Sequence, residues 1–387
     1  MERHLELKGR GLLLLSLLWF LWFNNIYSRA VFSPILPLLE DEFLVSHARA
    51  SGIFMFQSVG YGISLLLTGL YAGRLGYKKS IALSLAVTSA AFFLIPLVKT
   101  FSALYFFSLI IGFSAGSYIP SVIPLITEYF AEKNWGKSIV IHDSAASVSI
   151  FCTPFLALLF IHYFGWKGIF VTFAIIFLSA AAVFWLTVDE LKITQARKNL
   201  HSDLFRKRAL WMMGAIWVCA TGATWSVYFT VPLYLTKELG LTIEYANSLF
   251  GLSRLGGIGV VIACGFLVDR VSVRKMIFTL LLLSGVLTVL VGTSSARFIG
   301  VVLSLQVIFI MGFYPLGLTA IARTFDREER GMATGIIMTV SMSTGSGLIT
   351  YLLGLSGDLI SFRFGYVALG ALVILGSSLL FSLKELK

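Results

Sequence analysis

Long uninterrupted stretches of apolar residues dominate the sequence, and short polar segments separate them. Each stretch is about 20 residues long, which is the length that an α-helix needs to cross the hydrocarbon core of a bilayer. The apolar residues run continuously and do not alternate with polar ones, which favours helices over the strands of a membrane barrel. The pattern predicts spans at residues 11–39, 50–72, 79–98, 101–126, 138–161, 168–188, 209–236, 245–268, 276–294, 298–322, 333–355 and 364–383.

The composition is typical of a chain that is solvated by lipid. Hydrophobic residues make up 58% of the 387 residues and charged residues only 13%, whereas soluble domains carry about 25% charged residues. The mean hydropathy is +0.90. The first stretch follows Lys8 and Arg10, as the core of a signal peptide would, but it continues to about Leu39 without a small-residue cleavage site. We interpret it as a retained first helix of an all-α membrane protein.

The positive charges predict how the chain crosses the membrane. A net charge of +11 first suggests a nucleic-acid partner, but 22 of the 30 Lys and Arg residues fall in the tails and loops on one side of the predicted spans, and six fall on the other side. Such a bias marks the cytoplasmic side, so both termini are expected inside the cell. No nucleic-acid partner is predicted, and the short loops suit a bacterial inner membrane.

The two halves of the chain repeat each other. Phe54 to Gly69 matches Phe250 to Gly265 at an offset of 196 residues, and Pro120 matches Pro315 at an offset of 195. Several such matches in the same order indicate an internal repeat of six helices. We therefore predict an N-terminal bundle at 1–188, a polar and basic cytoplasmic linker at 189–208, and a C-terminal bundle at 209–387. Transporters use such repeats to rock one half against the other around a site near the middle of the membrane.

Two loop sequences identify a family. Residues 69–79 read GLYAGRLGYKK after the second span, and residues 265–275 read GFLVDRVSVRK after the eighth. Both resemble the G-x-L-x-D-R-x-G-R-R signature of the major facilitator superfamily, a large family of secondary transporters. The segments at 112–130 and 165–170 are also similar to that family, so the resemblance covers essentially the whole chain. It implies twelve transmembrane helices in two six-helix repeats, and transport by alternating access.

In that family the signature forms a conformational latch on the cytoplasmic side. Glycine allows two helices to approach closely, and a carboxylate there pairs with arginine and with a helix N-terminus. The sequence departs from the pattern at Gly73, which replaces the aspartate, and at Ser272, which replaces a glycine. Topology alone also explains the flanking basic residues. The resemblance places the latch at Gly69, Arg74, Gly76 and Lys78, and at Gly265, Asp269, Arg270 and Arg274.

Two arginines, Arg29 and Arg254, lie within predicted spans, where a permanent charge is costly and indicates function. The helical rise places Arg29 about 15 Å from the outer end of the first span and Arg254 about 14 Å from the outer end of the eighth. Two guanidiniums from opposite halves at similar depth predict a clamp for a carboxylate or a similar oxyanion. The alternative is that each arginine pairs with a nearby acid or backbone carbonyl.

One acidic residue, Asp143, lies well within a span, about 10 Å into the fifth. It is a candidate for proton coupling, because it could take up a proton when the substrate or an arginine leaves. It is equally a candidate for a permanent counter-ion to Arg29. His142 is adjacent, but successive residues of a helix point about 100° apart, so the pair is not a ready-made relay.

Further polar residues could complete a binding cavity. Asn25 lies one helical turn before Arg29, and Gln57 lies in the second span. In the family that the chain resembles, helices 1, 4, 7 and 10 line the cavity, which implies four more candidates. Each of these residues alone is more typical of packing or of a hydrogen bond between helices. The four are Tyr118, Tyr228, Gln306 and Tyr314.

Other chemistries find little support in the sequence. No G-x-x-x-x-G-K-[ST] loop is present, so no nucleotide cofactor is predicted. The five histidines and three cysteines have no metal-ligand spacing, so no metal site is predicted. We predict a secondary transporter, monomeric and not an enzyme, for a small organic anion such as a carboxylate, with protons as the coupling ion. The alternatives are a proton-driven exporter of amphipathic compounds and, from another class, a membrane sensor or an intramembrane enzyme.

Overall fold

The apolar stretches fold into long helices in the computed structural model, which describes residues 5–189, 202–257, 260, 271–326 and 328–383. Ten helical segments in these ranges are long and apolar enough to cross a membrane. One of them, Glu132–Thr187, holds two predicted spans, which Gly165 separates by adopting a φ of 66°. The described helices thus match the predicted spans closely, except that most of the eighth span beyond residue 257 lies outside the described ranges.

The contacts within the chain define two compact units. Unit 1 comprises Met1–Phe32 and Val59–Arg197, and unit 2 comprises Ser33–Ser58 and Lys198–Lys387. The two six-helix bundles predicted at 1–188 and 209–387 were defined by the sequence repeat and not by contacts. Those boundaries stay a prediction.

Unit 1 is built around α7, against which α1 and α4 pack along their lengths. Its helices are α1 (Arg10–Ala30), the second part of α3 (His47–Leu75), α4 (Tyr77–Leu94), α5 (Phe101–Gly116), α6 (Tyr118–Tyr129) and α7 (Trp135–Thr187). One short β-bridge between Leu5 and Phe130 joins the N-terminal segment to the end of α6.

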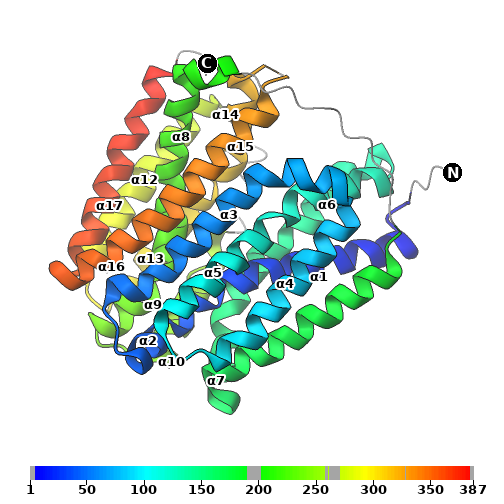
Figure 1. Ribbon diagram of the computed structural model, residues 1–387. Coiled ribbons are helices and arrows are strands. Elements are labelled where there is room, and N and C mark those ends of the chain that lie inside the picture. Colours follow the sequence, from blue (N-terminus) through cyan, green and yellow to red (C-terminus); the bar gives the residue numbers. More distant parts are fainter. Residues whose placement is uncertain (1–4, 190–201, 258–259, 261–270, 327, 384–387) are drawn as a thin grey trace. The chain divides into compact units, whose positions relative to one another are not determined.

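Unit 2 contains α12 packed along α17, and α8, α15 and α17 lie side by side in Figure 1. Two π-helical segments, η4 (Gly222–Ser226) and η5 (Ser341–Leu348), interrupt its helices and contact each other. The α-helices are α2 (Phe32–Phe43), the first part of α3, α8 (Arg208–Thr221), α9 (Val227–Lys237), α10 (Ile243–Leu252), α12 (Val273–Thr293), α13 (Ile299–Met311), α14 (Phe313–Thr324), α15 (Arg330–Val340), α16 (Ile349–Leu359) and α17 (Phe362–Ser377).

Three of the helix breaks follow from prolines. A proline has no N–H to offer the carbonyl four residues earlier, and its ring crowds that carbonyl. Helix α1 ends at Ala30, four residues before Pro34, and α5 ends at Gly116, four residues before Pro120. Helix α13 ends at Met311 in the same relation to Pro315. These spans are therefore broken near their middles, which frees backbone groups there.

The segment Ser33–Ser58 packs into unit 2 although it comes early in the sequence. The ring of Phe54 stacks on that of Phe229, with centroids 4.1 Å apart. The carboxylate of Asp358 accepts hydrogen bonds from the backbone N–H groups of His47 at 2.8 Å and Ala48 at 2.9 Å. A side chain of α16 thus caps the N-terminus of α3, where free N–H groups favour a negative charge.

Candidate functional site

The most unusual charge in unit 2 is Arg254. Its side chain is only 5% exposed. The guanidinium carbon lies 4.7 Å from the ring centroid of Phe250 and 5.0 Å from that of Tyr228. Among the described residues, neither Nε nor Nη2 has a hydrogen-bond partner. An aromatic face stabilises a desolvated cation by about 2 kcal/mol or more, and it leaves the in-plane N–H donors of the guanidinium available to an anion.

The backbone at Arg254 is not a regular α-helix. Helix α10 ends at Leu252, and the N–H groups of Arg254 and Leu255 then bond to carbonyls three residues earlier, at 3.0 Å and 3.2 Å. The next residue is Gly256, where an added Cβ would lie 2.5 Å from a side-chain carbon of Ile308. A side chain at 256 would therefore hold this segment away from α13. The tight approach and the turn together fix the buried arginine at the break.

Unit 1 has a corresponding cation in Arg29, in the last turn of α1. The side chain is 7% exposed, and its guanidinium carbon lies 4.3 Å from the ring centroid of Tyr61 on α3. Asn25, one turn earlier and buried, donates a hydrogen bond from Nδ2 to the carbonyl of Ala115 at 3.2 Å. Asn25 therefore links α1 to the last turn of α5, just before the point where α5 ends at Gly116.

A cluster of rings in unit 1 surrounds the two candidate proton groups. Trp22, Tyr118 and His142 lie with their ring planes within 15° of parallel and their centroids 5.4–5.9 Å apart. The Tyr118 hydroxyl lies 3.3 Å from His142 Nε2 and donates to the carbonyl of Leu18 at 2.9 Å. His142 is fully buried, and its Nδ1 has no hydrogen-bond partner in the described part of the chain.

Trp22 also reaches the acid. Its indole Nε1 donates to Asp143 Oδ1 at 3.3 Å. The Asp143 side chain is exposed on unit 1, unlike that of His142, so the two point to different surroundings, as expected for neighbours on a helix. Trp22 contacts both. It was not among the predicted site residues, although residues 22, 25 and 29 follow the i, i+3, i+7 spacing of one helical face, which is a signal that could have identified it.

Several predicted site residues lie beside helix breaks. Tyr118 and Tyr314 come one and two residues after Ser117 and Gly312, where the helices of these spans are interrupted, and Tyr228 comes two residues after η4. Interrupted helices and π-segments are frequent at functional sites because they leave backbone groups unused. Of the three tyrosines, Tyr228 contacts Arg254 and Tyr118 contacts His142.

The remaining polar candidates have their own surroundings. Gln306 is fully buried and donates from Nε2 to the carbonyl of Ala223 at 2.8 Å, so it satisfies a backbone group of η4. Gln57 is 1% exposed, and its Nε2 has no hydrogen-bond partner among the described residues. Tyr314 contacts the ring of Trp217, with centroids 5.9 Å apart.

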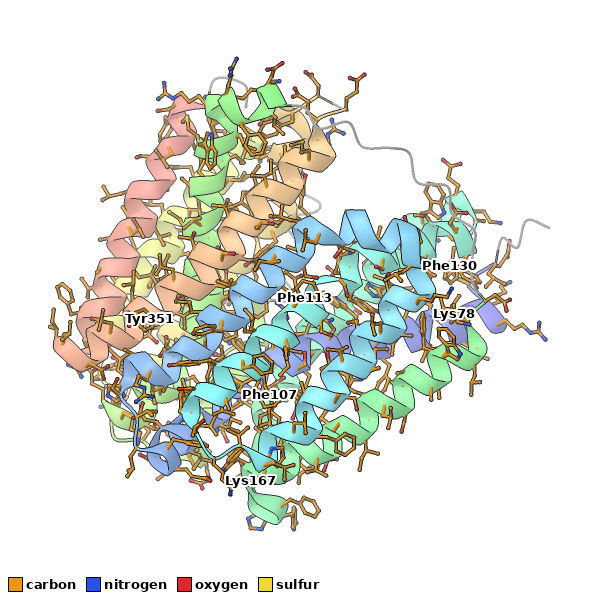
Figure 2. All side chains as sticks on the ribbon, in the orientation of Figure 1. Lys78, Phe107, Phe113, Phe130, Lys167 and Tyr351 are labelled. Atoms are coloured by element: carbon orange, nitrogen blue, oxygen red, sulfur yellow. The ribbon has the colours of Figure 1, made fainter. Side chains whose placement is uncertain are left out.

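The structure describes part of the predicted latch. Gly76 adopts a φ of 87° just before α4, a conformation that favours glycine. Lys78, labelled in Figure 2, places its ammonium nitrogen 4.6 Å from the ring centroid of Trp185. Arg274 donates to the carbonyl of Leu383 at 2.5 Å. For Gly69 and Arg74 only the α3 backbone is described, while Cys264, Gly265, Asp269 and Arg270 lie outside the described residues.

These features together define a class of protein. Long apolar helices that break near their middles, a buried cation in each unit and a carboxylate within a span are the features of a membrane transporter. Residues 18–272 and 246–386 match the Major Facilitator Superfamily. The chain belongs to that family, and it is a multi-pass membrane transporter and not an enzyme.

Known relatives and structures agree with this assignment. The chain is 25% identical over 308 residues to the gallate transporter of Pseudomonas putida, covering 69% of this chain and 67% of that one. It is 24% identical over 350 residues to the putative niacin/nicotinamide transporter NiaP of Bacillus subtilis (84% and 81% covered), and 25% identical over 370 residues to multidrug resistance protein 2 of the same species (91% of each).

Two solved structures share the fold. One is a bacterial homologue of the human lysosomal transporter Spinster, in an inward-facing and unoccupied conformation, with a TM-score of 0.80, 13% identity and 97% of both chains covered. The other is a D-xylose–proton symporter, with a TM-score of 0.75, 15% identity, and 96% of this chain and 97% of that one covered.

Proposed function

We propose that the chain carries a small organic carboxylate across the membrane by alternating access, in symport with protons. The observation that carries the proposal is the environment of Arg254. The side chain is buried, and two of its three nitrogens have no hydrogen-bond partner among the described residues. A buried donor that stays unsatisfied costs about 1–3 kcal/mol, and more when it is charged. A carboxylate would supply both the missing acceptors and the opposite charge.

Arg29 is the proposed second anion-binding cation. It is buried against Tyr61 within unit 1, and its guanidinium stays protonated throughout the physiological pH range. Two permanent cations within the spans favour an anionic substrate over a cationic drug or a neutral sugar. The contrasting interpretation of Arg29, as a structural residue that binds only protein groups, predicts that its removal changes stability but not ligand selectivity.

The relatives support a carboxylate. Gallate and niacin, named for two of them, are both aromatic rings with one carboxyl group. Such a molecule suits a guanidinium bordered by Tyr228 and Phe250, because the ring can contact aromatic faces while the carboxylate binds the cation. One relative is named as a multidrug resistance protein, so export of amphipathic compounds is the second candidate function. Binding of organic cations and neutral compounds tests it directly.

Asp143 is the proposed proton-coupling residue. A carboxylate that is exposed within a membrane-spanning helix must contact water or a partner, since lipid would not tolerate its charge. Asp143 has this exposure, and Trp22 fixes one of its oxygens. His142 is the second candidate, because its buried ring has one nitrogen without a described partner. We further propose that the protein is a monomer in the bacterial inner membrane. The charge bias predicts that both of its termini lie in the cytoplasm.

The first experiment measures thermal stabilisation of the purified protein by aromatic and aliphatic carboxylates, phosphate, sugars and organic cations. A ligand that binds only the folded state raises its stability by RT ln(1 + [L]/Kd). The variants are Arg254→Gln and Arg29→Gln, with Arg297→Gln as the control, because Arg297 is an exposed arginine that also borders an aromatic ring.

We expect one class of carboxylates to stabilise the wild type and the control but neither of the other two variants. Stabilisation by cations or neutral compounds that is the same in all four proteins would overturn the anion proposal and favour the exporter. Loss in Arg254→Gln alone would leave Arg29 with a structural role.

The second experiment tests coupling in proteoliposomes. With Asp143→Asn, we expect exchange of labelled for unlabelled substrate to continue while a pH gradient no longer drives accumulation, because the variant cannot take up the proton. His142→Gln is run in parallel. Gradient-driven accumulation at the wild-type level in Asp143→Asn would exclude Asp143 as the coupling residue.

A further inference from the structure

An apolar groove in unit 2 is lined by none of the candidate site residues that the structure describes. It has a volume of about 510 Å³ and runs between α8, α15 with η5, and α17. Its lining is almost entirely hydrocarbon and includes Trp211, Val218, Ile337, Leu372 and Leu375. Trp211 is 52% exposed and Leu375 is 69% exposed. These helices are long and apolar enough to cross a membrane, so exposed apolar side chains along the groove are suited to contact lipid. We call it the α8/α17 groove.

Missing side chains create the groove. Gly214 on α8 belongs to the lining, and a Cβ added there would meet no heavy atom within 4 Å. At the floor, a Cβ on Gly376 would lie 2.3 Å from the sulfur of Cys219, so α17 approaches α8 there as closely as glycine permits. The close contact between Gly376 and Cys219 thus closes the groove on one side, and the missing side chain of Gly214 leaves space within it.

The length of the groove matches one leaflet. On α8 the lining extends from Leu210 to Cys219, which is ten residues, or nine helical steps of about 1.5 Å, and therefore about 14 Å along the helix. This is about half of the ~30 Å hydrocarbon core. An acyl chain that entered from the nearer surface would reach the middle of the bilayer at the closed end.

Three consecutive basic residues, Arg206, Lys207 and Arg208, come shortly before the groove-lining part of α8. All three are exposed, and they precede Leu210, the first lining residue of α8, by two to four residues. Arg208 is three residues before Trp211, which places it on the same helical face. Lys207 forms an ion pair with Glu329 at 2.6 Å, so the two arginines are the cations available to a headgroup. Clusters of this kind next to a span attract anionic lipids.

We propose that the α8/α17 groove is a binding site for one anionic phospholipid, with an acyl chain along Gly214 and the phosphate against Arg206 and Arg208. This lipid is a bound component of the transporter and is distinct from the transported anion, so the proposal does not depend on the substrate assignment. The apolar lining accounts for the chain, and the two arginines account for the charge of the headgroup.

Native mass spectrometry of the delipidated full chain tests the proposal. Phosphatidylglycerol and phosphatidylcholine with the same acyl chains are titrated separately, and glycerol phosphate serves as the headgroup alone. We expect one tightly retained phosphatidylglycerol per chain, weaker retention of phosphatidylcholine, and none of glycerol phosphate. The double variant Arg206→Gln/Arg208→Gln should weaken phosphatidylglycerol about thirty-fold, since each cation near the surface contributes about 1 kcal/mol and 1.4 kcal/mol is tenfold.

Gly214→Phe should abolish retention because the ring fills the groove, and Gly214→Ala is the matched control that leaves most of the space open. If Gly214→Phe does not fold, the arginine variant and the comparison of the two lipids decide the outcome. Equal retention of the two phospholipids, or unchanged phosphatidylglycerol binding in the arginine variant, would overturn the proposal.

Discussion

Replacing Gly345 by alanine should destabilise the protein through the close contact between η5 and the C-terminal end of α8. The hydroxyl of Ser226 in η4 donates to the carbonyl of Gly345 in η5 at 2.7 Å. Thr221 donates to the carbonyl of Ser341 at 2.9 Å. A Cβ on residue 345 would lie 1.9 Å from Thr221 Oγ1 and 2.7 Å from the carbonyl oxygen of Val218. Moving the first atom away would break the hydrogen bond to Ser341, although the carbonyl of Trp217, at 2.8 Å, also lies within its reach. The second atom belongs to the backbone.

The magnitude follows from three terms. Forcing a methyl group into a packed contact costs about 1–3 kcal/mol. Losing the Thr221 hydrogen bond costs about 1 kcal/mol more. Alanine regains about 0.5–1 kcal/mol over glycine within a helix. The free energy of unfolding should therefore fall by about 1–3.5 kcal/mol, which lowers the apparent melting temperature in detergent by about 2–14 °C for a unit of this size.

Gly335→Ala is the matched control, because a Cβ at Gly335 on α15 meets no heavy atom within 4 Å. It should leave the melting temperature unchanged or raise it by about 1–3 °C. Adding Thr221→Ala to Gly345→Ala should restore part of the loss, because Thr221 Oγ1 is then absent while the carbonyl of Val218 remains. Melting temperatures for Gly345→Ala and Gly335→Ala that agree within about 1 °C would refute the close contact between α8 and η5.

Three further outcomes are expected. Asp358→Ala should lower the free energy of unfolding by about 1–2 kcal/mol, because the α3 N-terminus loses its cap, whereas Asp358→Asn should cost less; equal melting curves for the two would contradict capping. Trp22→Phe keeps an aromatic ring but removes the hydrogen bond to Asp143, so the pH profile of transport should shift while substrate affinity stays constant. An unchanged pH profile would show that Trp22 does not position Asp143 for proton uptake. The Glu329 carboxylate raises the pKa of Lys207, so the ion pair stabilises the fold at neutral pH, and this stabilisation is lost only as the pH rises through the lysine pKa. Because such a pair near the surface contributes little, Lys207→Gln should change the free energy of unfolding by less than about 1 kcal/mol at pH 7. A larger loss would show that Lys207 has a buried structural role.

The helices could be predicted from the sequence because membrane thickness imposes a length on every apolar stretch. The stretch predicted at 298–322 became α13 and α14, Ile299–Thr324. The breaks within the spans were also accessible, since Pro34, Pro120 and Pro315 each lie four residues after a helix end. Burial of Arg29 and Arg254 followed from their depth alone, and both side chains are buried.

The surroundings of those residues could not be predicted. Trp22 joins His142 and Asp143 because α1 packs against α7, which brings together residues 121 positions apart in the sequence. The rings of Tyr228 and Phe250 border Arg254 because α9 and α10 pack side by side. Such contacts depend on the rotation of each helix about its axis, and the hydropathy pattern of a span that is apolar on every side carries little information about that rotation.

The packing of Ser33–Ser58 into unit 2 has a consequence for the order of assembly. The backbone N–H of His47 donates to the carboxylate of Asp358, which is synthesised 311 residues later in the chain. At synthesis rates of about 5–20 residues per second this interval is about 15–60 s. The N-terminal end of α3 therefore enters the membrane long before its cap exists, and unit 2 can be completed only when α16 has been inserted. A chain that stops before α16 leaves one of its earliest helices unfinished.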